Sequence, residues 1–150
     1  MVNDPMIEVV SQASSIALDT CAFIYFIEDN TTYASLLEPV MQAIDNGTKS
    51  GITSVLTLLE VLVKPLAENR TEIAEAYRNT LLSSNIQTIL IDDAVAHEAA
   101  KIRANYKFKV PDSIQLAVAK LNNAEVFITN DDQLRKFTDL KVIILKDYVN

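Results

Sequence analysis

Residues 110–132 have the sequence VPDSIQLAVAKLNNAEVFITNDD, and they are the part of the chain that best indicates its fold. Pro111 suits the first turn of a helix, and the residues after it predict a helix that runs to about Leu121. The apolar run from Glu125 to Thr129 then predicts a buried strand. A buried strand directly after an amphipathic helix is typical of the parallel sheets of α/β domains.

The rest of the chain repeats this alternation of short apolar runs and amphipathic segments. Further strands are predicted at Ser15 to Leu18, Gly51 to Thr53, Ile86 to Ile91 and Val142 to Leu145. Further helices are predicted at Cys21 to Ile27, Tyr33 to Asp45, Val55 to Val63 (ended by Pro65), Arg70 to Leu82, Ala94 to Ala104 and Asp131 to Phe137. We therefore expect one domain over residues 1–150, an α/β/α sandwich of three layers around a parallel sheet.

Composition excludes several classes of protein. The chain has 49% hydrophobic and 22% charged residues, which is typical of a compact globular domain. One Cys and one His exclude a disulfide framework and a zinc site of Cys and His ligands. The sequence contains neither a signal-peptide pattern at its start nor an apolar stretch of about 18 residues, so we expect a cytoplasmic protein without a membrane span.

The charge is acidic overall and unevenly distributed. Thirteen Lys and Arg residues against twenty Asp and Glu give a net charge of −7, which disfavours a simple electrostatic binder of nucleic acid. Residues 101–109 (KIRANYKFK) nevertheless carry four cations and no anion, namely Lys101, Arg103, Lys107 and Lys109. With Tyr106 and Phe108 between them, these cations could bind RNA, or the segment could be a solvated helix end over buried aromatic side chains.

Four carboxylates stand out by their positions in the predicted elements: Asp19, Glu60, Asp112 and Asp131. Three of them have ordinary explanations as helix caps, first-turn acids or turn residues. Glu60 differs because it lies in VLTLLEVLV, a helix that is apolar on nearly every side, where an ionised carboxylate costs several kcal/mol unless it is paired or metal-bound. Its ordinary partner would be Lys64, one turn later.

The ordinary explanations do not account for a shared location of these four acids. In a doubly wound sheet, residues that follow strands or begin helices meet at the carboxyl edge, where ligands bind. Carboxylates that converge there repel one another, and a divalent cation relieves the repulsion. A ligand set of oxygen atoms alone suits Mg²⁺ or Mn²⁺ better than Zn²⁺, and one or two such ions activate water for phosphodiester hydrolysis.

The sequence also resembles a known family, the PIN-domain nucleases, and among them the VapC-like toxins of type II toxin–antitoxin pairs. The resemblance runs from Ile16 to about Leu145 and rests on four motifs in the family's order. These are Leu18-Asp19-Thr20, then Thr53-Ser54 with Leu59-Glu60-Val61, then Val110-Pro111-Asp112-Ser113-Ile114 with Ala117 and Ala119, and last Thr129-Asn130-Asp131 with Leu134. Leu134 departs from the family pattern, in which an aromatic residue is frequent.

The resemblance implies a five-stranded sheet and an endoribonuclease that uses Mg²⁺ or Mn²⁺ to hydrolyse RNA with activated water. It implies that the catalytic, metal-binding acids are Asp19, Glu60, Asp112 and Asp131, and that the supporting polar groups are Thr20, Ser54, Thr129 and Asn130, with Asp132 able to assist or replace Asp131. It also implies a cognate antitoxin that covers the acidic cleft. The apolar helix from Ser54 to Val63 separately indicates a homodimer.

Three alternatives remain open at this point. A PIN-like interaction or regulatory module, in which the acids only cap helices, predicts no affinity for metal. A domain that transfers phosphate through an aspartyl intermediate is disfavoured, because Cys21 stands where a second Asp would be expected after Asp19. Catalysis by a Cys21 and His97 pair is also disfavoured, because both residues suit ordinary helix positions.

Overall fold

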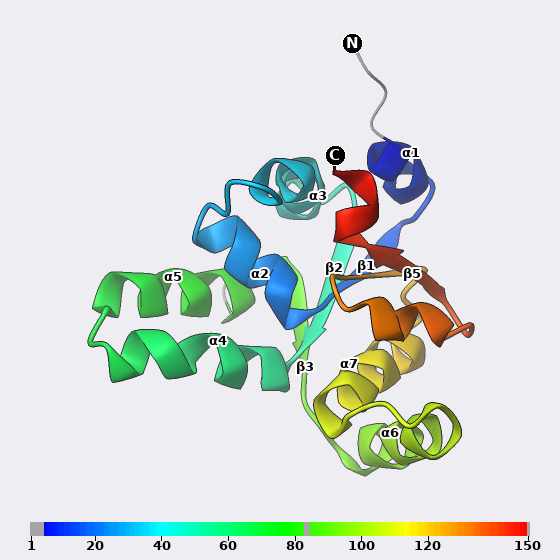
Figure 1. Cartoon of the computed structure of the whole chain (residues 1–150). Coiled ribbons are helices and arrows are strands. Elements are labelled where there is room, and N and C mark those ends of the chain that lie inside the picture. Colours follow the sequence, from blue (N-terminus) through cyan, green and yellow to red (C-terminus); the bar gives the residue numbers. More distant parts are fainter. Residues whose placement is uncertain (1–4, 83–84, 150) are drawn as a thin grey trace.

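The centre of the molecule is one sheet of parallel strands. A computed structural model of the chain describes residues 5–82 and 85–149. The strands are β1 (Ser15–Leu18), β2 (Ser50–Ser54), β3 (Ile86–Ile89), β4 (Val126–Thr129) and β5 (Lys141–Ile144). They pair in the order β3-β2-β1-β4-β5, and every pairing is parallel (Figure 1). This confirms the expected α/β/α fold with five parallel strands.

Helices cover both faces of this sheet. The α-helices are α1 (Pro5–Ser11), α2 (Thr20–Ile27), α3 (Ala34–Asp45), α4 (Val55–Ala67), α5 (Thr71–Leu82), α6 (Asp93–Tyr106) and α7 (Val110–Leu121). Two 3₁₀ turns, η1 (Asp132–Lys136) and η2 (Leu145–Tyr148), lie near the C-terminus. Side chains from α1 to α5 pack on one face, and side chains from α6, α7 and η1 pack on the other.

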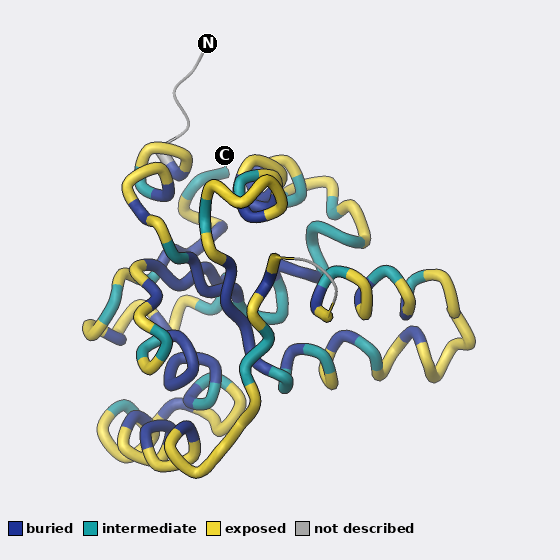
Figure 2. The backbone as a smooth tube through the Cα atoms, turned by 180° about the vertical axis from the view of Figure 1, so that it is seen from behind, coloured by how far each residue is buried: buried dark blue, intermediate teal, exposed yellow. Residues whose placement is uncertain are grey.

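The strands are buried because their side chains alternate between these two layers. Ile16 and Leu18 of β1 belong to the core under α1 to α5, whereas Ala17 between them packs with residues of α6 and α7. In Figure 2 the strands form the dark blue centre of the molecule, and the exposed parts of the helices lie around it. A strand with no solvent-facing side shows continuous apolar character, which is why short apolar runs predict the strands well.

One helix boundary differs from the sequence-based expectation, and one helix was not expected. Pro65 does not end its helix, since α4 continues to Ala67 with the Pro65 ring buried. The missing N–H of a proline removes one hydrogen bond, and here the break falls in the last turn, where the helix is about to end in any case. The N-terminal helix α1 was not predicted, although it packs through Met6 and Val10 onto the core.

The connections place several helix starts at the carboxyl edge of the sheet. One residue separates β1 from α2, α4 begins directly after β2, and two residues separate β4 from η1. Helix α7 starts at Val110 and packs against β2. This edge therefore collects the residues that join strands to helices. Within the described ranges, no helix combines the length and the apolar character that crossing a bilayer requires.

Candidate active site

Asp19 is held rigidly at the end of β1. As N-cap of α2, its Oδ1 accepts a hydrogen bond from the Thr20 backbone N–H at 2.8 Å, so the expected capping role is real. Its Oδ2 accepts from the Thr129 hydroxyl of β4 at 2.7 Å. Burial raises the pKa of Asp19, and the charges of Glu60 and Asp131 raise it further, against the lowering effect of these two hydrogen bonds.

Asp112 lies in the first turn of α7 and faces the same space. Burial raises its pKa to about 6, and the negative charges of Asp19, Asp131 and Glu60 add to the rise, whereas Lys109 lowers it. A first-turn acid that served only the helix dipole would show the opposite direction, because the dipole favours the charged form. The raised pKa of Asp112 therefore reflects its burial first, and the neighbouring carboxylates in addition.

Asp131 completes the group from the other side of β1. It caps η1, with its Oδ1 accepting from the Gln133 backbone N–H at 2.9 Å, and its own N–H donates to the Thr129 hydroxyl at 3.2 Å. Together these three aspartates border an open pocket of about 470 Å³. Its lining residues are Asp19, Cys21, Tyr25, Asp112, Thr129, Asn130, Asp131, Asp132, Gln133 and Lys146.

Glu60 lies beside this pocket in a setting that differs from the expectation. Glu60 is exposed on α4. The expectation that its carboxylate would pay a burial penalty in an apolar helix is therefore wrong. The extra apolar residues of that helix, among them Leu59, are themselves on the surface. The Glu60 carboxylate accepts from the Thr20 hydroxyl at 2.7 Å, and no ion pair joins it to Lys64 in the described ranges. The described part of the structure therefore does not show the ordinary alternative, an ion pair between Glu60 and Lys64.

The donor set fits a hard divalent cation. The four acids offer only carboxylate oxygens, and at two of the positions, Asp19 and Asp112, the charges of the other acids act as unfavourable neighbours that a cation would offset. As the side chains stand, no three Asp, Glu, His or Cys residues of the described part of the chain are close enough to share one ion. An ion held by one or two carboxylates directly and by the others through water is the coordination that Mg²⁺ prefers.

Two of the supporting groups touch the carboxylates directly. The Thr20 hydroxyl donates to Glu60, and the Thr129 hydroxyl donates to Asp19. Both hydroxyl groups are therefore placed to fix the direction in which an acid points. Such partners orient the ligands of a metal and are a common part of metal sites.

The remaining supporting groups, Ser54, Asn130 and Asp132, interact with residues other than the four acids. The buried Ser54 hydroxyl donates to Gln115 at 2.9 Å and contacts no acid of the group in the described hydrogen bonds. Asn130 accepts from the Lys146 backbone N–H and donates to the Tyr25 hydroxyl. Asp132 forms ion pairs with Arg135 and Lys146 at 2.9 and 2.8 Å, and these cations lower its pKa. Asp132 is thus engaged by cations, and Asp131 is the better candidate ligand.

Most residues of the basic segment 101–109 have structural roles in or next to α6. Lys101 pairs with Glu98 at 3.2 Å, and the Arg103 guanidinium donates to the Phe108 carbonyl. Lys107 caps the end of α6 with a φ of 62°. Lys109 precedes α7, and it is the cation of this segment whose charge acts on Asp112.

The aromatic residues of that segment belong to the core. Phe108 is buried, and Tyr106 stacks on it with ring centroids 5.1 Å apart. Tyr106 also packs edge-on against Phe137. For Phe108, the second of the two interpretations, a helix end over buried aromatic side chains, is therefore the correct one. Its ring is not free to stack on an RNA base.

Five residues at or behind the site were not singled out from the sequence, and one of them is Gln133 at the pocket. Tyr25 and Lys146 line the pocket, and Thr57 and Gln115 form buried hydrogen bonds behind it. Gln115 had a visible signal, because it is a lone amide among apolar residues on a helix with a buried face. Lys146 had a signal as well, because it follows the closing strand and such residues lie at the carboxyl edge of the sheet. Tyr25 had none, since its approach to the pocket depends on the tertiary packing.

Cys21 and His97 do not form a nucleophile and base. Cys21 lines the pocket, but burial and the charge of Asp19 raise its pKa to about 12, so the thiol is protonated at neutral pH. His97 lies exposed on α6. A protonated thiol is a poor nucleophile, and this alternative is set aside.

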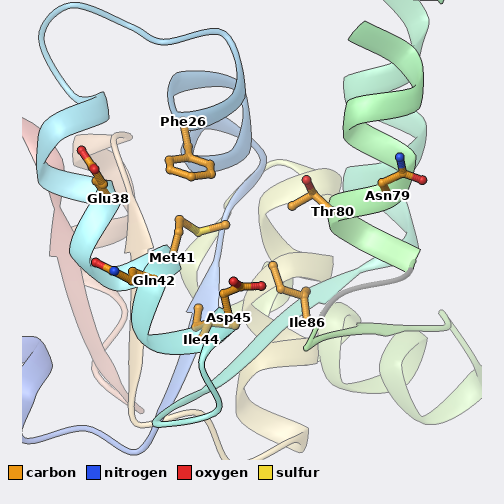
Figure 3. Close-up of a pocket in the computed structure, with 9 residues that line it drawn as sticks. All are labelled: Phe26, Glu38, Met41, Gln42, Ile44, Asp45, Asn79, Thr80 and Ile86. Atoms are coloured by element: carbon orange, nitrogen blue, oxygen red, sulfur yellow. The ribbon is translucent and has the colours of Figure 1, made fainter. Parts of the chain in front are cut away.

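A second cavity, of about 510 Å³, lies between α2, α3, α5 and the start of β3, away from the four candidate acids. Figure 3 shows Phe26 and Met41 on one side of it and Asn79 and Thr80 of α5 on the other. The other lining residues are Glu38, Gln42, Ile44, Asp45 and Ile86. It contains none of the candidate site residues, so the chemistry points to the smaller acidic pocket.

The raised pKa of Asp112 predicts a pH-dependent stability difference. Because the folded-state pKa is about 6 and lies above the ordinary value of 3.8, ionisation of Asp112 destabilises the folded chain as pH rises through about 6. The Asp112→Asn protein cannot ionise there. Without metal, the Asp112→Asn protein should melt at a higher temperature than the wild type, and this difference should increase from about pH 4 to about pH 7. Thermal unfolding followed by circular dichroism measures it. A difference that stays constant over this range would contradict the assignment.

Comparison with known proteins agrees with this geometry. Residues 16–140 match the model of the PIN domain family, and comparison with curated proteins gives no match. Among solved structures, DNA-bound VapBC from Salmonella typhimurium matches with a TM-score of 0.69 and 18% identity, and VapBC2 from Rickettsia felis bound to a promoter DNA fragment with 0.66 and 16%. VapBC-5 from Mycobacterium tuberculosis matches with 0.58 and 25%. Each alignment covers 87% of this chain and 98% of the other. The chain belongs to the PIN domain family.

Proposed function

We propose that the protein is an endoribonuclease that depends on Mg²⁺ or Mn²⁺. Its family membership supports a nuclease in general terms. The observation that carries the finer proposal is that Asp19, Asp112 and Asp131 border one pocket. Burial raises the pKa values of Asp19 and Asp112 there, and the charges of neighbouring acids raise them further. Such a cluster suits a divalent cation and the phosphate that the cation attracts. We place the nuclease domain over residues 1–150 and the protein in the cytoplasm.

The proposed mechanism assigns a separate task to each side chain. Asp19, Asp112 and Asp131 would hold the metal, with Glu60 at the open side of the site. A bound Mg²⁺ or Mn²⁺ ion would activate water and stabilise charge on the phosphate. Thr129 and Thr20 keep Asp19 and Glu60 in their orientations through the hydrogen bonds described above. RNA as the substrate follows from the resemblance to VapC-like toxins.

The basic segment has a narrower role in this proposal than the sequence indicated. Of Lys101, Arg103, Lys107 and Lys109, the last acts electrostatically on Asp112 and is the best placed to meet the RNA backbone near the pocket. The other three would contribute to longer-range attraction of the phosphates.

We also propose a cognate antitoxin as partner. The similar solved structures include VapBC assemblies and a toxin–antitoxin complex from Klebsiella pneumoniae, which is 24% identical over 85% of this chain and 95% of that chain with a TM-score of 0.64. A segment of the antitoxin would cover the acidic pocket and exclude RNA. Cationic side chains in that segment would match the charge of the pocket.

A homodimer is proposed from the exposed surface of α4. Leu59, Val63 and Leu66 are 61%, 60% and 62% exposed, and their spacing of four and three residues places them in one stripe along the helix. Exposed Leu90 and Ile91 follow β3, whose last residue pairs with Ser54 just before α4. An apolar stripe of this kind on a helix hairpin that extends from the sheet (Figure 1) suits a second copy of the chain.

The Val63→Glu protein should be monomeric where the wild type is a dimer. A charge in the centre of the stripe would be buried without a partner in the interface. Size-exclusion chromatography with light scattering measures the mass, and Leu121→Glu, which changes an exposed leucine at the far end of α7, is the matched control. A wild-type protein that is monomeric, or a Val63→Glu protein that remains a dimer, would contradict the proposed interface.

The proposed activity is tested with purified protein and single-stranded RNA in the presence of Mg²⁺ or Mn²⁺, with and without EDTA. We expect cleavage that EDTA abolishes. Contaminating ribonucleases are usually active without metal, so sensitivity to the chelator separates the two sources of cleavage. A wild type that leaves RNA intact with either metal would favour a non-catalytic interaction module.

A further inference from the structure

A buried amide lies directly behind the acidic group. Gln115 is on α7, about one turn after Asp112, and only 3% of its surface is exposed. Its side-chain oxygen accepts from the Ser54 hydroxyl at 2.9 Å. Its nitrogen donates to the Thr57 hydroxyl at 2.7 Å and to the Thr20 hydroxyl at 3.3 Å. Both N–H groups and the oxygen of this amide therefore have hydrogen-bond partners, as a buried polar side chain requires.

The direction of these hydrogen bonds is determined by Glu60. A carboxylate only accepts, so the single hydrogen of the Thr20 hydroxyl goes to Glu60 at 2.7 Å. The Thr20 oxygen is then free to accept, and Gln115 offers it an N–H. If the amide were turned over, its oxygen would face the Thr20 oxygen without a hydrogen between them. The observed orientation of Gln115 and the donation from Thr20 to Glu60 are therefore compatible and support one another.

This network joins elements that bring the acids together. Thr20 follows Asp19 at the start of α2, Thr57 is on α4 one turn before Glu60, and Gln115 shares α7 with Asp112. Thr20 and Thr57 also contact each other, with their hydroxyl oxygens 3.1 Å apart. Gln115 links these segments without adding another negative charge to an already acidic place.

We propose that Gln115 is a positioning residue for Glu60. It holds the Thr20 hydroxyl in the orientation that donates to the Glu60 carboxylate, and thereby aims an otherwise exposed side chain at the acidic pocket. Without this support, an exposed glutamate on the surface of α4 would sample several rotamers, and its oxygens would spend less time near Asp19 and Asp112. The inference rests on the proposed metal-dependent nuclease activity.

The Gln115→Met protein tests this role, because methionine keeps the volume of the side chain and removes its hydrogen bonds. Partners that orient metal ligands contribute about 10- to 100-fold to metal affinity or activity, so we expect kcat and Mn²⁺ affinity to fall by a factor in that range. KM for RNA should stay unchanged, since a buried side chain does not touch the substrate. The control is Thr88→Val, which removes a hydrogen bond to the Leu81 carbonyl on the edge strand and should change neither quantity.

A double-mutant cycle separates action through Glu60 from a general effect. Mn²⁺ affinity is measured by calorimetry for the wild type, Gln115→Met, Glu60→Ala and the double variant. We expect Gln115→Met to lower the affinity in the wild-type background and to have no further effect in the Glu60→Ala background. Equal losses in both backgrounds, or wild-type Mn²⁺ affinity and kcat in Gln115→Met, would overturn the proposal.

Two further controls keep the outcome clear. If Gln115→Met does not fold, Ser54→Ala removes the anchor of the Gln115 oxygen without touching Thr20 or Glu60, and a smaller loss in the same direction is expected. Unchanged kcat and Mn²⁺ affinity in Ser54→Ala would then reject the positioning role. A wild-type protein that neither binds Mn²⁺ nor cleaves RNA would instead reject the proposed function, and the two failures are thereby distinguished.

Discussion

The Asp19→Asn protein should remain folded and cleave RNA at least about 100-fold more slowly than the wild type. Asparagine keeps the shape of the side chain and one oxygen that can accept from the Thr20 backbone N–H, so the start of α2 is preserved. The charge that would hold the metal is lost. Metal stabilisation of the transition state is worth several kcal/mol, and each ~1.4 kcal/mol is a factor of ten in rate.

The same substitution should make the metal-free protein more stable. Burial and the charges of Glu60 and Asp131 raise the pKa of Asp19, so the ionised carboxylate is unfavourable in the folded chain at neutral pH. We expect a higher melting temperature for Asp19→Asn without metal, together with the loss of cleavage. Asp45→Asn, at the exposed end of α3, is the control and should change neither property. Wild-type cleavage by Asp19→Asn would show that this carboxylate is not part of the reaction.

Stabilisation by Mg²⁺ should be much smaller in the Glu60→Gln protein than in the wild type. A ligand at about 100 times its Kd stabilises a fold by about 2.7 kcal/mol, which for a domain of this size raises the melting temperature by roughly 5 to 10 °C. The wild type should show this rise, and Glu60→Gln should show little of it, because the amide is a weaker ligand and changes the charge that faces Asp19 and Asp112. Thermal shift at increasing Mg²⁺ concentrations measures the effect.

Lys64→Ala is the matched control for this experiment, since the sequence offered Lys64 as the partner of Glu60. In the structure the Glu60 carboxylate accepts from Thr20. The Lys64→Ala protein should therefore keep the full response to Mg²⁺. If Glu60→Gln responds to Mg²⁺ like the wild type, Glu60 does not take part in binding the metal.

The sequence predicts the fold and the placement of three of the acids at one edge of the sheet, because both depend on local patterns. Buried strands appear as short apolar runs, and Asp19, Asp112 and Asp131 each stand where a strand ends or a helix begins. In a parallel sheet such positions lie at one edge whatever the details of packing. Their approach to one pocket could therefore be predicted without knowing any side-chain contact.

The setting of Glu60 could not be predicted in this way. Its helix is apolar on nearly every side, so the sequence does not say which face is buried, and the outer stripe with Leu59 and Val63 turns out to be exposed. The hydrogen bonds of Gln115 could not be predicted from the sequence either, since they join α7 to α2 and α4 through contacts that only the tertiary packing creates. Pro65 shows the same limit, because its effect depends on how close it lies to the end of its helix.

Calorimetric titration of Mn²⁺ into the wild type and into the Asp112→Asn protein is the most direct measurement of whether these carboxylates bind a divalent cation. At a pH above about 7 the Asp112 carboxyl, with its pKa of about 6, is ionised and available as a ligand. Saturable binding to the wild type, with an affinity at least about 10-fold lower in Asp112→Asn, is the expected result. Equal affinities in the two proteins, or no binding by the wild type, would contradict a metal site at this edge of the sheet.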